Sequence, residues 1–132
     1  MKPVFADTFF FLAALNPADA AHAAAIRWSR DNRRIRITTA WVLTEVADAL
    51  ARDNREAFLS LFDLVRRNPL FRFVEATPGL FERSVALYRQ RPDKAWSLTD
   101  CISFVVMGDE GITEALTGDR HFEQAGFVAL LA

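Results

Sequence analysis

Short apolar runs alternate with longer segments of helical periodicity along the chain, and no Pro-, Gly- or Ser-rich linker divides them. This order predicts an α/β fold with a mostly parallel central sheet of about five strands and helices on both faces. The chain has 132 residues, of which 52% are hydrophobic, and this is the size of one domain with one core. We therefore expect a single domain over residues 1–132.

The expected strands are the short apolar runs, which cover residues 3–6, 34–39, 70–76, 112–117 and 127–131. Helical patterns lie between them. They run from residue 8 to Asn16, from Asn16-Pro17 to about Arg30, over 40–52, over 55–67, from Pro78-Gly79 to about Arg89, and from near Asp100 onward.

Charge and cysteine content limit the possible functions. The net charge is -1 and the pI is near 6.1, so a nucleic acid would have to bind a local basic patch. The single cysteine, Cys101, excludes an internal disulfide and fits a cytoplasmic location. The first segment, MKPVFADTFFFLAAL, is interrupted by Asp7 and lacks a basic lead-in, so we expect neither a signal peptide nor a membrane span.

Four acidic residues stand where such a sheet would bring them together. Asp7 follows the first strand, and Asp119 follows the fourth in LTGDRHF. Ligands of parallel sheets bind at the carboxyl ends of the strands, where the strand order reverses, so we expect these two to be neighbours. Asp100 opens the helix before the fourth strand, and Glu45 borders the apolar stripe of the 40–52 helix.

Carboxylates gathered in this way repel one another unless a cation neutralises them, and Mg²⁺ or Mn²⁺ prefers such oxygen ligands. Each acid also has a purely structural interpretation. Ser97 and Asp100 match a capping box, and Asp119 follows a glycine in a turn. Asp7 could cap a short helix, and Glu45 could be a solvated flank of its helix.

At these positions the sequence resembles a PIN domain, specifically the VapC type of toxin ribonuclease, over nearly the whole chain. The motifs are FADT at 5–8, TTAWVLTEV at 38–46, WSLTDCIS at 96–103 and ALTGDRHF at 115–122. The resemblance implies an acidic quartet that is catalytic and holds Mg²⁺ or Mn²⁺, and three supporting polar groups. The quartet is Asp7, Glu45, Asp100 and Asp119, and the supporting residues are Thr8, Ser97 and Thr117.

The resemblance also implies a reaction and partners. The reaction is endoribonucleolytic cleavage of RNA by a metal-activated water, which leaves a 5′-phosphate and a 3′-hydroxyl. The partners are a small DNA-binding, VapB-like antitoxin of a type II toxin-antitoxin pair and a second copy in a homodimer. We expect Asp7, Asp100 and Asp119 to hold the metal, while Glu45 completes the shell or orients the water.

Other residues carry weaker signals. Arg120, Lys94 and Arg34 are candidate contacts for RNA phosphates, although a solvated basic face is the simpler interpretation. His121, two residues from Asp119, could serve as a proton carrier, but a surface position is the simpler interpretation, since a metal-water mechanism does not need a histidine. Cys101 is expected in the core because no activating base is placed beside it.

Two other functions fit parts of the sequence. A phosphoryl-receiver domain is also a parallel α/β fold with an acidic Mg²⁺ site, but it needs a lysine after a late strand. The only lysines here are Lys2 and Lys94. A non-catalytic, PIN-like module that binds metal or a partner also remains open. Dependence of RNA cleavage on metal and on Asp100 would separate the nuclease from such a module.

Overall fold

The structure, a computed structural model, describes all residues from Met1 to Ala132. Five strands form one sheet in the order β3-β2-β1-β4-β5, and every neighbouring pair is parallel. They are β1 (Val4–Ala6), β2 (Arg36–Thr39), β3 (Phe71–Val74), β4 (Glu114–Leu116) and β5 (Val128–Ala129). The expected parallel α/β fold is therefore confirmed, with strands somewhat shorter than the apolar runs.

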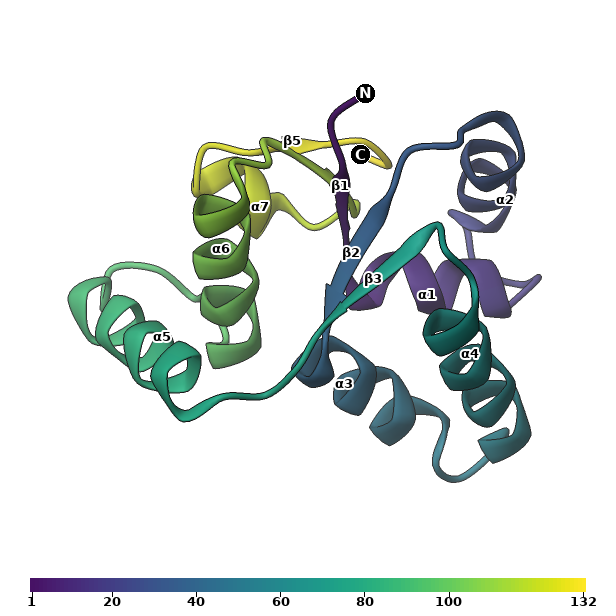
Figure 1. Ribbon diagram of the computed structural model, residues 1–132, viewed down its shortest axis with the longest axis horizontal. Coiled ribbons are helices and arrows are strands. Elements are labelled where there is room, and N and C mark those ends of the chain that lie inside the picture. Colours follow the sequence, from purple (N-terminus) through teal and green to yellow (C-terminus); the bar gives the residue numbers. More distant parts are fainter.

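Seven helices cover the two faces of the sheet. They are α1 (Thr8–Leu15), α2 (His22–Asp31), α3 (Ala40–Leu50), α4 (Arg55–Arg67), α5 (Pro78–Gln90), α6 (Leu98–Glu110) and α7 (Arg120–Gln124). In Figure 1, α1, α2 and α4 lie on one side of the sheet, and α6 and α7 lie on the other, with α5 packed outside α6. No helix combines the length and the apolar character that a bilayer crossing requires.

The start of α2 differs from the expected start at Asn16-Pro17. Asn16 ends α1, as expected, but its Oδ1 accepts a hydrogen bond from the amide of Ala18 at 3.0 Å. Asp19 then accepts one from the amide of Ala21 at 2.8 Å. Such side-chain bonds to the backbone two residues onward favour turns over helix, so the regular helix begins only at His22.

The core lies between the sheet and both helix layers. Phe5 of β1 is completely buried, and its ring centroid lies 6.3 Å from that of Phe122 in α7. Phe10 and Phe11 of α1 are 4% and 1% exposed, so the apolar side of this helix packs into the core. Cys101 of α6 is buried, as expected from the sequence. This packing fixes the beginnings of α1 and α6 at the carboxyl edge of the sheet.

Candidate active site

The strand order reverses at the centre of the sheet, between β1 and β4. From β1 the chain proceeds outward to β2 and β3, and it returns on the other side with β4 and β5. Asp7 directly follows β1, and Asp119 follows β4 by a short turn. Adjacent parallel strands end at the same edge of a sheet, so this topology brings the two acids close together as expected.

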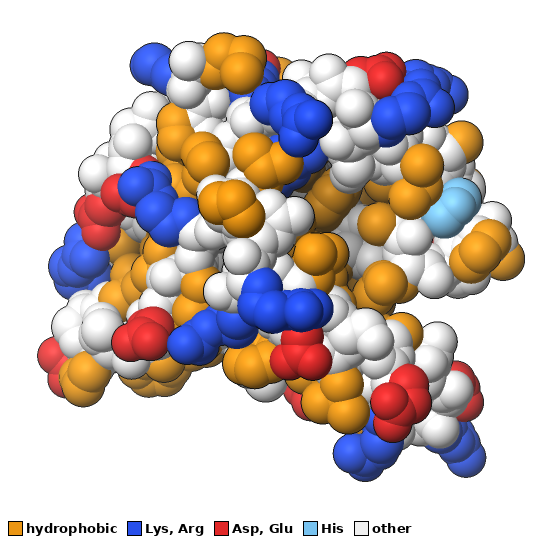
Figure 2. All heavy atoms as spheres, turned by 45° about the vertical axis from the view of Figure 1, so that its right-hand side comes forward, with side chains coloured by type: hydrophobic (Ala, Val, Ile, Leu, Met, Phe, Trp, Pro, Cys, Tyr) orange, Lys and Arg blue, Asp and Glu red, His pale blue; other side chains and the backbone are white.

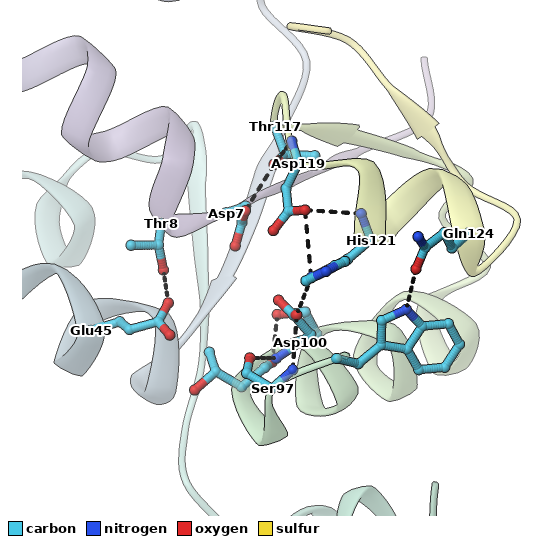
Figure 3. A network of polar contacts seen from close by, with 12 residues as sticks. Asp7, Thr8, Glu45, Ser97, Asp100, Thr117, Asp119, His121 and Gln124 are labelled. Carbon is cyan, nitrogen blue, oxygen red and sulfur yellow. Dashed lines mark hydrogen bonds and ion pairs between the residues drawn. The ribbon is translucent and has the colours of Figure 1, made fainter. Parts of the chain in front are cut away.

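A cleft of about 540 Å³ opens at this edge, and all four acids of the predicted quartet line it. Its lining residues are Asp7, Thr8, Phe9, Leu12, Glu45, Ala95, Ser97, Asp100, Asp119 and His121. In Figure 3 the carboxylates of Asp7, Asp100 and Asp119 face one common space, and Glu45 lies at its side. The cleft joins residues from α1, α3, α6 and the turn before α7.

Asp7 is the most deeply buried of these acids, with 6% of its surface exposed. Burial is the main cause that raises its pKa to about 7, and the negative charges of Asp100 and Glu45 raise it further. Hydrogen bonds from the Thr117 hydroxyl and the Thr8 amide lower this pKa but do not offset the burial. A cation bound beside Asp7 would therefore displace a proton at neutral pH.

Asp100 is both a helix cap and a wall of the cleft. The Ser97 hydroxyl accepts a hydrogen bond from the Asp100 amide, and Oδ2 of Asp100 accepts one from the Ser97 amide, each at 3.0 Å. This capping box starts α6. The Asp100 side chain is nevertheless 13% exposed and lines the cleft. The structural and the site interpretations of this residue are therefore compatible.

Asp119 is held in place by the turn that precedes α7. Its amide donates to the Thr117 hydroxyl at 3.1 Å, and its own Oδ1 accepts from the His121 amide at 2.9 Å. The sequence did not predict α7, because five residues offer too little periodicity to be recognised. This short helix turns the residue after next, His121, back toward the cleft.

Gly118 permits a close approach within the same turn. A Cβ atom at this position would lie 2.5 Å from Cζ of Phe9, which is shorter than any normal contact. Phe9 itself lines the cleft beside Asp7. The glycine thus allows the Asp119 turn to lie directly against the first turn of α1.

Glu45 reaches the cleft from α3. The hydroxyl of Thr8, the first residue of α1, donates a hydrogen bond to Oε1 of Glu45. This bond ties the carboxylate to the residue that follows Asp7. Glu45 is half-buried, so its position is not that of a freely solvated flank.

His121 lines the cleft, whereas a surface position was the simpler interpretation of the sequence, and its contact with Asp100 was not predicted. Its Nδ1 lies 3.0 Å from Oδ2 of Asp100 and 3.5 Å from Oδ1 of Asp119. Ligand atoms of these three residues lie within 4.8 Å of one another, whereas Asp7 and Glu45 lie outside this tight group. The available signal was the two-residue spacing from Asp119, which at a helix start can place both side chains on one side.

The three predicted RNA contacts do not share one location. Arg34 forms an ion pair with Glu114 and donates to the carbonyl of Lys2 at 2.9 Å. These residues lie at the amino ends of the strands, at the opposite edge from the acids, so Arg34 does not border the cleft. Arg120 is exposed just beyond Asp119, and Lys94 lies in the segment before α6.

The donor set fits a hard divalent cation. Hydrogen bonds from the Thr117 and Thr8 hydroxyls, from His121 Nδ1 and from the Ser97 and His121 amides are accepted by Oδ2 of Asp7, Oε1 of Glu45, Oδ2 of Asp100 and Oδ1 of Asp119. The second oxygen of Glu45, Asp100 and Asp119 therefore accepts no hydrogen bond within the protein. No lysine or arginine lines the cleft to neutralise these charges. Oxygen ligands of this kind suit Mg²⁺ or Mn²⁺.

The protein is thus a parallel α/β protein with an acidic cleft at the point where the strand order of the sheet reverses. The model of the PIN domain family matches residues 4–128. The chain therefore belongs to the PIN domain family, which confirms the resemblance seen in its motifs.

Similar proteins span the same length as this chain. The 23S rRNA-specific endonuclease VapC20 of two Mycobacterium tuberculosis strains is 30% identical over 125 residues, which is 95% of each chain. The crystal structure of M. tuberculosis VapC20, a sarcin-ricin loop cleaving toxin, has a TM-score of 0.86 at 29% identity and covers 95% of this chain and 96% of its own. FitAcB of Neisseria gonorrhoeae shares the fold, with a TM-score of 0.64 at 17% identity over 96% and 94% of the chains.

Proposed function

We propose that the protein is a metal-dependent endoribonuclease that hydrolyses RNA phosphodiester bonds, and that it is the toxin of a type II toxin-antitoxin pair. The observation that carries this proposal is the meeting of four carboxylates in one cleft at the switch point of the sheet. The likeness to an rRNA endonuclease over 95% of the chain supports the choice of RNA as substrate.

In this proposal Asp7, Asp100 and Asp119 hold Mg²⁺ or Mn²⁺ with their carboxylate oxygens. The bound ion would supply a water of lowered pKa and would offset negative charge at the reacting phosphate. Thr117 orients Asp7, to which it donates at 2.9 Å. Glu45, held by Thr8, has a free oxygen that orients the attacking water or completes the metal shell.

His121 positions Asp100 in the same proposal. An ionised carboxylate can only accept hydrogen bonds, so the 3.0 Å contact with Oδ2 of Asp100 requires the proton on Nδ1 of His121. This bond, together with the bond from the Ser97 amide, fixes Oδ2 and leaves the other oxygen for the cleft. Groups that orient metal ligands in this way commonly strengthen metal binding.

We also propose an antitoxin partner, which binds the helix layer formed by α1, α2 and α4. An apolar hollow of about 280 Å³ lies between α1, α2 and α4, on the face that Figure 2 shows, where apolar side chains surround a depression. It is lined by Phe10, Phe11, Leu61 and Leu64 among others, and by Arg36. An antitoxin segment would insert apolar side chains here. A homodimer and a cytoplasmic location complete the proposal.

Arg36 is a buried cation in the lining of this hollow. Arg36 is 3% exposed, and its guanidinium donates to the carbonyls of Ser29, Asn32 and Arg34, but no acid pairs with it. Burial lowers its pKa, and the neighbouring charge of Arg33 lowers it further. An acidic group in the partner segment would compensate this buried charge.

The test of the enzymatic proposal is cleavage of a defined RNA. A sarcin-ricin-loop oligonucleotide and total rRNA are incubated with the protein in Mg²⁺, in Mn²⁺ or in EDTA. We expect products with 5′-phosphate ends that require metal, and a loss of rate of about a hundredfold or more in Asp100→Asn. Equal cleavage in EDTA, or by Asp100→Asn, would overturn the proposal. Metal binding without cleavage of any RNA would favour the non-catalytic module.

A further inference from the structure

The acidic cleft cannot by itself attract RNA. None of its ten lining residues is a lysine or an arginine, and the whole chain carries a net charge of -1. Contacts between cationic side chains and phosphates supply a large share of the free energy with which proteins bind RNA. Cationic side chains that recruit RNA phosphates therefore lie outside the lining of the cleft.

A groove of about 430 Å³ lies at the end of α5 and along the segment that follows it. Its lining residues are Val85, Tyr88, Arg89, Arg91, Pro92 and Lys94, and we call it the α5 groove. Three of these six residues are cations and none is an acid. The groove is therefore a concave basic surface on a protein that has no overall positive charge.

Two of the three cations are available to a ligand. Arg91 forms an ion pair of 2.9 Å with Asp93 and lies over the ring of Trp96, 5.1 Å from its centroid. Arg91 therefore holds the segment between α5 and α6 in place. Arg89 and Lys94 form no ion pair and no side-chain hydrogen bond with the protein. Their charges remain free for phosphate groups.

Tyr88 gives the groove an aromatic surface. Tyr88 is 52% exposed, which is high for a large aromatic residue. Unpaired RNA bases commonly stack on exposed aromatic rings, and neighbouring cations hold the backbone beside them. An aromatic ring and two free cations in one groove fit single-stranded RNA better than a double-stranded RNA helix, whose bases are not exposed for stacking.

The α5 groove and the acidic cleft are lined by neighbouring residues of one chain segment. Lys94 lines the groove, while Ala95 and Ser97 line the cleft. Three residues of extended chain span at most roughly 10 Å, so Lys94 lies only a short step along the backbone from Ser97. The buried Trp96 anchors this connecting segment, because its Nε1 donates to Gln124 at 3.1 Å.

We propose that the α5 groove binds the single-stranded RNA segment that leads into the acidic cleft. Arg89 and Lys94 contact its phosphates, and Tyr88 stacks on an unpaired base. This inference rests on the proposed ribonuclease function and adds to it the surface that takes up the substrate.

The test measures RNA binding in a cleavage-deficient background. Asp100→Asn protein is titrated against a fluorescently labelled sarcin-ricin-loop RNA in Mg²⁺ at several salt concentrations. Adding the pair Arg89→Ala and Lys94→Ala should weaken binding at least about tenfold and reduce the salt slope by about two. Adding Tyr88→Leu should weaken binding about tenfold with an unchanged salt slope, because stacking is uncharged.

The matched control removes two exposed cations elsewhere with Arg52→Ala, in the turn after α3, and Arg55→Ala, at the first residue of α4. It changes the net charge equally and should alter binding less than about twofold. Equal weakening by the control and the groove pair would overturn the inference while leaving the ribonuclease proposal intact. If Asp100→Asn binds no RNA and the wild type cleaves none, the ribonuclease proposal itself fails.

Discussion

The hydroxyl of Thr117 donates a hydrogen bond of 2.9 Å to Oδ2 of Asp7, across the boundary between β4 and β1. The same hydroxyl accepts the amide hydrogen of Asp119 at 3.1 Å. One completely buried side chain thus joins two acids that come from opposite ends of the sequence. The geometry of the cleft therefore depends on a residue that has no charge of its own.

Replacing Thr117 by valine keeps the shape of the side chain but removes both bonds. We expect the metal-free protein to lose about 1–3 kcal/mol in its free energy of unfolding, because the Asp7 carboxyl and the Asp119 amide lose a buried partner. Urea unfolding measures this loss. Thr117→Ser, which keeps the hydroxyl, should recover most of the loss from the hydrogen bonds, and equal losses in both variants would contradict the account.

The raised pKa of Asp7 makes the metal-free protein less stable as the pH rises. Its pKa is about 7 in the folded protein, above the ordinary 3.8, so the folded state retains a proton that the unfolded state releases between these values. This contribution is complete below about pH 4 and is lost by about pH 7. It amounts to at most roughly 4 kcal/mol.

Asp7→Asn tests this pH dependence, since an amide cannot titrate. Urea unfolding in EDTA at several pH values should show the wild type losing stability relative to Asp7→Asn as the pH rises from about 5 to 8. A difference that is constant over this range would show that Asp7 has an ordinary pKa.

Gly118→Ala should force the ring of Phe9 out of place, because the new Cβ would lie 2.5 Å from its Cζ atom. We expect a cost of about 1–3 kcal/mol in stability. Phe9→Leu makes room, so the double variant should be more stable than the sum of the two single changes predicts. A double-mutant cycle by urea unfolding measures this coupling, and strict additivity would contradict the predicted clash.

His121→Ala should weaken Mn²⁺ binding by about tenfold or more, because Asp100 loses the group that orients it. His121→Asn, whose amide can still donate, should retain part of the affinity. Isothermal titration measures both, and melting in EDTA checks that each variant is folded. Unchanged affinity in His121→Ala would exclude the positioning role.

Several features could be predicted from the sequence because they depend on local signals or on sheet topology. The bounds of α4 match the prediction because Asn54 caps one end and Asn68-Pro69 follows the other. The meeting of Asp7 and Asp119 followed from the rule that parallel strands end at one edge of the sheet. Both results rest on short-range chemistry or on a general property of parallel sheets.

The remaining features depend on long-range geometry. The contact of His121 with Asp100 requires α7, which is too short to leave a periodic pattern. Arg34 was one of three candidate RNA contacts, but it pairs with Glu114, which lies 80 positions away in sequence and across the sheet. Neither side-chain partner is visible in a local pattern, because residue type alone does not say which distant groups become neighbours.

The central claim, that the four acids form a divalent-metal site, is tested most directly by thermal melting against increasing Mn²⁺. Asp100→Asn is compared with the wild type, and Asp109→Asn serves as control because this exposed acid on the same helix pairs with Arg83, away from the cleft. We predict a rising melting temperature in the wild type and in Asp109→Asn, and no rise in Asp100→Asn. An equal rise in all three proteins, or none in the wild type, would contradict the claim.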